Sequence, residues 1–424
     1  MLKKKYLKIK KNNFEMKCRF CSKPLKHVLI DLGHAAPSNF FLEKKLNSKP
    51  EVWYPLVIYV CDKCWLVQTK DYLETDEIFS SNYHYFSSYS KDWLSQCKRY
   101  VDKITKKLEL YKENKFVVEV ASNDGYLLQY FKEKKIKNLG VEPTKSTAAI
   151  AKKKGLNVVQ KFFNKNIANE IKKKYKKADL IIANNVLAHV PDINNFVKGF
   201  KVLLNKNGVA TFEFQYLSNI IKYGQFDTLY HEHYSYLSLT FLKKLFKENN
   251  LKIYDVEKLP THGGSLRVYV THIDSRKNKE TELCKKMFEK EKFDGMNKIK
   301  FYQKFNLKAE KIKYDLLEFL IKIKKNKKKV MAYGAASKGN TLLNYCGIRK
   351  DLVSCIIDAN VNKINKYAPG SHIKVVSEKN IQQEKPEYIL ILPWNLKNEI
   401  INQLKYIKKW KGKFLIPVPK LKII

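Results

Sequence analysis

The pattern that most constrains the fold is an apolar strand followed by a short polar turn and a helix, repeated from residue 115 onward. The first apolar run, 116–120, leads into the polar turn 123–125, and a helical stretch follows. Two further apolar runs end in polar residues within 139–143 and 178–184. Alternating strands and helices form a doubly wound sheet that binds ligands at the carboxyl ends of its strands. We therefore predict an α/β fold with a ligand site at these turns.

The glycine content of the first turn separates two kinds of ligand. A dinucleotide site has the pattern G-x-G-x-x-G, whereas this turn has one glycine, Gly125. One glycine lets an adenosyl ligand without a pyrophosphate approach the backbone. Glu142, after the second strand, is placed to bind ribose hydroxyls. The order of these parts, with a later strand at 209–213, looks like an S-adenosylmethionine (SAM)-dependent methyltransferase, and we predict that fold and cofactor.

Two cysteine pairs near the N-terminus have the spacing of a metal site. Cys18-x-x-Cys21 and Cys61-x-x-Cys64 can form two knuckles that bring four thiolates together. Four thiolates leave no open position on Zn²⁺, so we predict a structural zinc ion. Within the gap between the pairs, we expect residues 31–39 to form a loop that faces the active site. The other four cysteines have no such partners, and we interpret them as core or surface thiols.

The segment Tyr-His-Glu-His at 230–233 concentrates a phenol, two imidazoles and a carboxylate in four residues. Because imidazole titrates near neutral pH, such a cluster can take a proton from a weakly acidic carbon and hold the resulting charge. The alternative is that these side chains are half-buried interface residues. A tight turn follows at 262–264, where two glycines come before Ser265.

The formal net charge of +42 does not by itself indicate a nucleic-acid partner. The chain has 83 Lys and Arg residues, yet five are arginine, the residue that base readout and phosphate binding favour. We interpret the lysines as solvated helix faces. The basic N-terminus is not followed by an apolar segment, and no run of 18 apolar residues occurs. We expect a cytoplasmic monomer without a membrane or nucleic-acid partner.

A second α/β unit begins after residue 328. Apolar runs at 330–334, 353–357 and 388–392 predict a second sheet, and the turn 335–339 opens a helix. The backbone N–H groups of this turn can bind an anion. We predict that it holds the nucleotide diphosphate of a substrate, with Ser337 and Lys338 as contacts. A nicotinamide site is the alternative, which the incomplete glycine pattern disfavours.

Taken together, these motifs resemble the sugar C-methyltransferases of deoxysugar biosynthesis, which act on nucleotide-linked 4-keto-6-deoxy sugars. The resemblance covers nearly the whole chain and implies a zinc-binding N-terminal module, a central methyltransferase domain and a Rossmann-like C-terminal domain. The matching motifs are the paired CxxC, Tyr83-x-Tyr85-x-Ser87-Ser88-x-Ser90, Glu119-x-Ala-Ser-Asn-Asp-Gly125, Gly140-Val-Glu-Pro143, Asn184-x-x-x-x-His189, Tyr230-His-Glu-His233, His262-Gly-Gly-Ser-Leu-Arg267, Gly334-Ala-Ala-Ser-Lys-Gly339, Tyr367-x-Pro-Gly370 and Leu392-Pro-Trp-Asn395.

The resemblance implies a role for each matching residue. His233 would be the general base, with Tyr230, Glu232, His189 and Tyr85 beside it. Either Tyr83 or Tyr85 could face the chemistry, and both would help to hold the sugar or the cofactor. The cofactor-binding residues would be Tyr83, Ser88, Glu119, Ser122, Asn123, Asp124, Gly125, Glu142, Pro143 and Asn184. Arg267, Ser337 and Lys338 would bind the substrate, and Cys18, Cys21, Cys61 and Cys64 the zinc ion.

We therefore expect a SAM-dependent enzyme that methylates a carbon, C3 of the sugar, next to the C4 ketone through an enolate. The alternatives are an O- or N-methyltransferase of another small molecule, a non-catalytic SAM-binding protein and a nucleic-acid methyltransferase. The expected division of the chain is a zinc module at 14–75, a methyltransferase domain at 76–274, a helical linker at 275–328 and a nucleotide-sugar-binding domain at 329–424.

Overall fold

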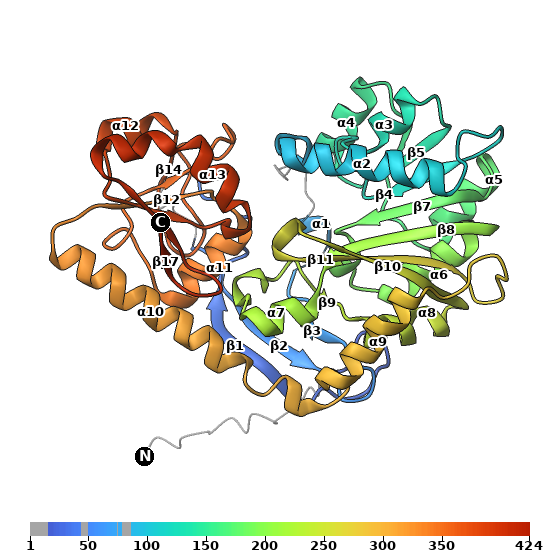
Figure 1. The fold of residues 1–424 in the computed structure, drawn as a ribbon, viewed down its shortest axis with the longest axis horizontal. Coiled ribbons are helices and arrows are strands. Elements are labelled where there is room, and N and C mark those ends of the chain that lie inside the picture. Colours follow the sequence, from blue (N-terminus) through green and yellow to red (C-terminus); the bar gives the residue numbers. More distant parts are fainter. Residues whose placement is uncertain (1–15, 44–49, 74, 79–85) are drawn as a thin grey trace, which may run out of the picture.

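The computed structural model describes residues 16–43, 50–73, 75–78 and 86–424. Figure 1 shows two α/β lobes that meet above a small sheet near the N-terminus. No helix among the described residues has the length and apolar character needed to cross a bilayer.

The N-terminal sheet has the strand order β1-β2-β3-β9, and every neighbouring pair is antiparallel. Its last strand, β9, follows the 230–233 segment directly and so ties that segment to the N-terminal module. The expected loop at 31–39 is partly wrong, because the alternation of buried Ile30, Leu32 and Ala35 with exposed residues continues β1 through Ala35. The bounds are β1 His27–Ala35, β2 Tyr54–Val60, β3 Val67–Thr69, α1 Thr75–Ile78 and β9 Ser235–Tyr236.

The central sheet has seven strands in the order β10-β11-β8-β7-β4-β5-β6. Five consecutive strands from β8 to β6 are parallel, and β11 pairs antiparallel with both of its neighbours. The parallel strands are buried on both faces, which explains their continuous apolar sequences. The bounds are β4 Val117–Val120, β5 Asn138–Val141, β6 Val158–Val159, β7 Ala178–Asn184, β8 Leu204–Gln215, β10 Leu251–Leu259 and β11 Ser265–His272.

Polar side chains begin several helices of the central unit. Ser90, Asn164, Asp192 and Ser238 each accept a backbone N–H at the first turn of α2, α5, α6 and α8. The bounds are η1 Ser87–Tyr89, α2 Lys91–Lys107, α3 Leu128–Glu133, α4 Lys145–Lys153, α5 Lys165–Lys174, η2 Leu187–His189, α6 Ile193–Leu203, α7 Leu217–Tyr223, η3 Phe226–Thr228, α8 Leu239–Glu248 and η4 Thr261–Gly263.

Two helices, α9 and α10, lead to a second α/β lobe with the strand order β14-β13-β12-β15-β16-β17. All neighbours in this sheet are parallel except β16 and β17. The bounds are α9 Glu282–Asp294, η5 Ile299–Phe301, α10 Phe305–Lys325, β12 Val330–Tyr333, α11 Ser337–Cys346, β13 Ile356–Ile357, β14 Val375–Val376, α12 Lys379–Glu384, β15 Tyr388–Ile391, η6 Trp394–Leu396, α13 Lys397–Gln403, η7 Lys405–Trp410, β16 Lys413–Ile416 and β17 Lys422–Ile423.

The N-terminal strands share an apolar core with the C-terminal lobe. Leu29, Ile58, Leu316 and Ile389 belong to one continuous buried cluster, which therefore spans β1, β2, α10 and β15. The cysteine knuckles instead pack in the core of the central sheet, where Phe20 meets Phe241 edge-on at a ring separation of 5.4 Å. The N-terminal module thus packs against both lobes.

Candidate active site

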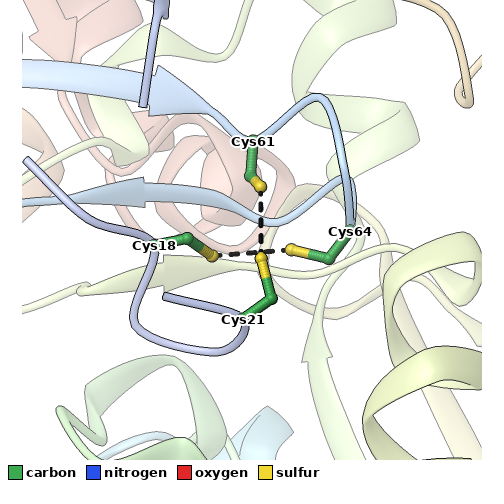
Figure 2. A group of neighbouring side chains, drawn as sticks. All are labelled: Cys18, Cys21, Cys61 and Cys64. Carbon is green, nitrogen blue, oxygen red and sulfur yellow. Dashed lines mark hydrogen bonds between the residues drawn. The ribbon is translucent and has the colours of Figure 1, made fainter. Parts of the chain in front are cut away.

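The four cysteines predicted to bind zinc lie together (Figure 2). Their sulfur atoms are all within 4.8 Å of one another, with Cys18 and Cys64 at 3.5 Å and Cys21 and Cys61 at 3.6 Å. A tetrahedral Zn²⁺ with bonds of about 2.3 Å requires sulfur separations of about 3.8 Å. The donor set therefore fits a structural zinc ion, and the Gln68 Nε2 donates a hydrogen bond to the Cys18 sulfur at 3.1 Å.

The predicted cofactor residues meet at the carboxyl ends of β4, β5 and β7. The turn after β4 is tight, because Asn123 and Gly125 both have positive φ, and a Cβ on Gly125 would lie 2.2 Å from Leu156. Asn123 and Asp124 are joined to η1, since the Ser87 N–H donates to the Asn123 Oδ1 and the Ser88 N–H to the Asp124 Oδ2.

Within the part of the chain that the structure describes, several buried polar groups at this edge of the sheet have few or no hydrogen-bond partners, as expected of a ligand site. Apart from the nearby Tyr126 hydroxyl, no described residue bonds the Glu119 carboxylate or the Asn184 amide. The Ser122 hydroxyl and the Asp124 Oδ1 are also unpaired among the described residues. Burial raises the pKa of Glu119 well above its usual value, and a cation bound beside it would favour the charged carboxylate and offset that shift. These groups fit SAM, which carries an ammonium group, a carboxylate and ribose hydroxyls.

Glu142 ends β5 next to the same pocket, and Pro143 follows it. The Glu142 carboxylate accepts hydrogen bonds from the backbone N–H groups of Asn123 and Thr144, at 2.9 Å each, and from the Thr147 hydroxyl at 3.1 Å. These bonds hold the Glu142 carboxylate at the end of β5, where the sequence placed it.

Tyr230 and His233 form a hydrogen-bonded pair in the cleft. The His233 Nδ1 lies 3.2 Å from the Thr228 carbonyl oxygen, which fixes the proton on that nitrogen. Its Nε2 is therefore an acceptor, and the Tyr230 hydroxyl donates to it at 2.9 Å. Burial lowers the pKa of His233 well below 6.5, and the neighbouring His189 lowers it further. The ring is consequently neutral, with a basic nitrogen at Nε2.

His189 lies beside this pair, with its ring 4.6 Å from the His233 ring. It projects from η2, just after β7, and its Nδ1–H donates to the Glu232 carbonyl oxygen at 2.7 Å. Burial lowers the pKa of His189 to about 4. The structure thus brings His189 together with Tyr230 and His233. His189 is 41 residues before Tyr230 in the sequence, whereas Tyr230 and His233 lie in one tetrapeptide.

The Glu232 side chain turns toward the N-terminal module. Its carboxylate accepts hydrogen bonds from the Ser38 hydroxyl at 3.0 and 3.1 Å and from the Asn39 backbone N–H at 3.1 Å. Asn39 in turn accepts a hydrogen bond from the Ser337 hydroxyl of α11 at 2.8 Å. Glu232 therefore links three parts of the chain.

Arg267 has its terminal nitrogens bound to carboxylates. They lie 2.6 Å from Glu213 and 3.1 Å from Glu257, and the guanidinium stacks on Tyr100 at 4.1 Å. Arg267, Glu213 and Asn184 line one small cavity next to the cofactor pocket. Tyr83 and Tyr85, the other residues implied near the chemistry, lie outside the described residues.

Two residues of the junction between the lobes were missed by the sequence reasoning. The Trp394 Nε1–H donates to Asp227 at 2.6 Å, and the Trp394 ring packs on the backbone of Gly263. Both are close to motifs in the sequence: Asp227 precedes Tyr230 by three residues, and Trp394 lies in the Leu-Pro-Trp-Asn run. Their closeness to these motifs could have marked both residues as candidates. Nothing in the sequence indicates that they pair with each other across 167 residues.

His262 was also left without a role. It has a positive φ of 52°, which is strained for a residue other than glycine. Its Nε2 lies 3.3 Å from the Asn185 side-chain nitrogen, and its ring lies 5.4 Å from Trp93 of α2. His262 thus stands at the carboxyl end of the central sheet, close to the cofactor pocket.

The doubly wound sheet with one reversed strand, and the buried polar groups at its carboxyl edge, are typical of a SAM-dependent methyltransferase. Comparison with known families agrees. A zinc binding domain matches residues 18–79, a methyltransferase domain matches 93–256, and a C-methyltransferase C-terminal domain matches 260–419. These three domains are the ones that the predicted resemblance to C-methyltransferases implies, and the predicted class of fold, the SAM-dependent methyltransferase class and both cofactors are confirmed.

One relative and two solved structures illustrate the similarity. C-methyltransferase NovU from Streptomyces niveus is 29% identical over 407 residues, which are 96% of each chain. A SAM-dependent methyltransferase from Clostridium acetobutylicum is 12% identical with a TM-score of 0.33, over 42% of this chain and 92% of that one. Magnesium protoporphyrin IX methyltransferase from Synechocystis is 13% identical with a TM-score of 0.34, over 48% of this chain and all of that one.

Proposed function

We propose that this enzyme methylates a carbon next to the C4 ketone, at C3, of a nucleotide-linked 4-keto-6-deoxy sugar. The Tyr230–His233 pair supports the proposal best. In this pair the basic nitrogen of a neutral imidazole accepts a hydrogen bond from a phenol hydroxyl. A carbon acid needs a base at this position, whereas a hydroxyl or amine acceptor is already nucleophilic. The sequence resemblance to sugar C-methyltransferases names the acceptor.

In this proposal His233 Nε2 removes the proton from the carbon, and the electron pair moves onto the ketone oxygen to give an enolate. The Tyr230 hydroxyl turns from His233 to donate to that oxygen, and His189 orients the base through the contact of their rings. When bound, SAM would supply the methyl group that the enolate carbon accepts, together with the thioether leaving group. A positioned base contributes about 10²- to 10⁴-fold to such a reaction.

We assign the cofactor to the pocket that contains Glu119, Ser122, Asp124 and Asn184. Their unpaired polar groups support this assignment, with the Glu119 carboxylate facing the ammonium group of the methionine portion. Glu142 and Pro143 would flank the ribose. Ser88, whose hydroxyl accepts a hydrogen bond from Lys154 at 3.0 Å, would close the pocket from η1.

The nucleotide diphosphate would bind at the first turn of α11, where Ser337 and the backbone N–H groups offer donors. Glu232 would act indirectly, by holding Asn39 in place. Arg267 would likewise hold Glu213 in place. We retain the division of the chain at 14–75, 76–274, 275–328 and 329–424, and a cytoplasmic monomer.

Mass spectrometry tests the proposal directly. Thymidine-, cytidine- and guanosine-diphosphate-linked 4-keto-6-deoxy sugars are incubated with the enzyme and SAM, beside the variant His233→Asn. We expect one sugar to gain a methyl group on carbon, and the variant to lose about 10²- to 10⁴-fold in kcat while SAM still binds. A methyl group on oxygen or nitrogen, or full activity of His233→Asn, would contradict the proposal.

A further inference from the structure

Lys338 lies closer to the 227–233 segment than its place in the second lobe suggests. It is in the first turn of α11, which contacts that segment on two sides. The Thr341 hydroxyl donates to the Leu229 carbonyl oxygen at 3.2 Å, and Ser337 reaches Glu232 through Asn39. Lys338 follows Ser337 on this helix. Burial lowers the pKa of both His233 and His262, and the charge of Lys338 lowers each further.

Among the described residues, Lys338 has polar and aromatic neighbours but no carboxylate in a direct ion pair. Its half-buried Nζ donates to the Asn395 Oδ1 at 2.8 Å and lies 4.8 Å from the centre of the Trp394 ring. The carboxylate that acts on it is Asp227, which is fully buried and bound to the Trp394 indole. The second oxygen of Asp227 has no hydrogen-bond partner among the described residues. The titratable groups near Lys338 are Asp227, His233 and His262.

We propose that Lys338 is a catalytic residue whose ammonium stabilises the negative charge that forms on the ketone oxygen when His233 removes the neighbouring proton. Asp227 is a positioning residue that keeps Lys338 charged. This inference rests on the proposed function and changes one assignment within it. In the step concerned, the C–H bond breaks, its proton goes to the His233 Nε2, and its electron pair becomes the enolate beside Lys338.

The helix geometry separates this role from phosphate binding. Successive residues of an α-helix project about 100° apart, so the side chains of Ser337 and Lys338 point in different directions. Ser337 faces the N-terminal module, whereas Lys338 lies over Trp394 at the junction of the lobes. A phosphate contact acts equally on bound substrate and transition state, whereas an enolate contact acts on the transition state alone. The two roles therefore predict different kinetics.

Deuterium exchange isolates the proton-transfer step. The sugar that wild-type enzyme methylates is incubated in D₂O with S-adenosylhomocysteine in place of SAM, and deuterium uptake next to the ketone is followed by NMR. We expect Lys338→Met to slow exchange at saturating substrate about 10²- to 10³-fold, as loss of an oxyanion donor does. Its affinity for the nucleoside diphosphate alone, measured by calorimetry, should match that of wild type. Unchanged exchange with weakened diphosphate binding would overturn the inference.

Two more variants keep the test decisive. Lys363→Met removes another lysine of the same lobe, whose Nζ donates to the Ala335 carbonyl oxygen, and it should retain exchange. Burial lowers the pKa of Lys338, and the Asp227 charge opposes that shift; Asp227→Asn keeps an acceptor for Trp394 but removes the opposing charge. Exchange in Asp227→Asn should therefore decline at a lower alkaline pH than in wild type, even where Lys338→Met folds poorly. An unmoved alkaline limb would overturn the role of Lys338. If wild type neither methylates nor exchanges any of the sugars, the proposed function itself fails.

Discussion

Removal of zinc should unfold the N-terminal module and loosen the active site. We consider Cys64→Ser, which replaces one of the four clustered thiolates at a position that is 2% exposed. The neighbouring sulfur of Cys18 lies 3.5 Å away and needs the ion to offset the repulsion between thiolates. The variant therefore leaves three ligands where a closed site requires four.

The size of the effect follows from what the knuckles support. Structural zinc contributes about 10–16 kcal/mol to folding in isolated zinc-finger peptides. That exceeds or matches the whole stability of a domain, about 5–15 kcal/mol. The Arg19 guanidinium, next to Cys18, donates to the Pro191 carbonyl oxygen at 3.1 Å, two residues beyond His189. Disorder of the knuckle would therefore also disturb the position of His189.

The assay is zinc content per chain together with thermal unfolding, with and without a chelator. We expect wild type to hold one zinc ion, and Cys64→Ser to lose it and to unfold at a lower temperature. Cys284→Ser is the matched control, because Cys284 is fully buried but outside the cluster. Our reasoning is refuted if Cys64→Ser keeps one zinc ion and the unfolding temperature of wild type.

Two further predictions concern the cleft. The acid limb of kcat/KM should lie below pH 6.5, because burial lowers the pKa of His233 and so keeps the base neutral to lower pH; an imidazole of pKa 6.5 would be only about a quarter neutral at pH 6.0. An acid limb on which kcat/KM is half-maximal at pH 6.5 or above would contradict this. Gly263→Ala should destabilise the enzyme by about 1–3 kcal/mol more than Gly295→Ala, measured by chemical denaturation. Both glycines have a φ near 84°, but a Cβ at Gly263 would lie 2.5 Å from Trp394, whereas at Gly295 nothing lies within 4 Å. Equal losses would show that the contact with Trp394 does not matter.

The surroundings of the 227–233 segment come from three parts of the chain. Glu232 reaches Asn39 of the N-terminal module, Asn39 reaches Ser337 of α11, and Trp394 of the C-terminal lobe reaches Asp227. A contact that pulls the lobes together therefore also positions the 227–233 segment. This arrangement explains why the N-terminal module lies beneath both lobes rather than at the end of one (Figure 1).

Local sequence determined the elements and the ligand chemistry. The zinc ligands could be predicted because CxxC spacing brings two sulfurs of each knuckle together within four residues. The cofactor edge could be predicted because strands of a parallel sheet end on the same side, so that the turns after residues 120, 141 and 184 must meet. The order of these elements was enough to predict the α/β class.

Tertiary structure alone decided how these parts combine. No spacing rule relates Trp394 to Asp227, and Glu232 could not be assigned to Asn39 because the direction of a side chain in an irregular turn depends on packing around it. The continuation of β1 through Ala35 depended on its pairing with β2. Lys338 follows the same logic: the sequence placed it in an anion-binding turn, and the packing of α11 against η3 brought its charge to His233. Local chemistry is encoded in neighbouring residues, whereas the direction of each side chain is set by contacts between distant ones.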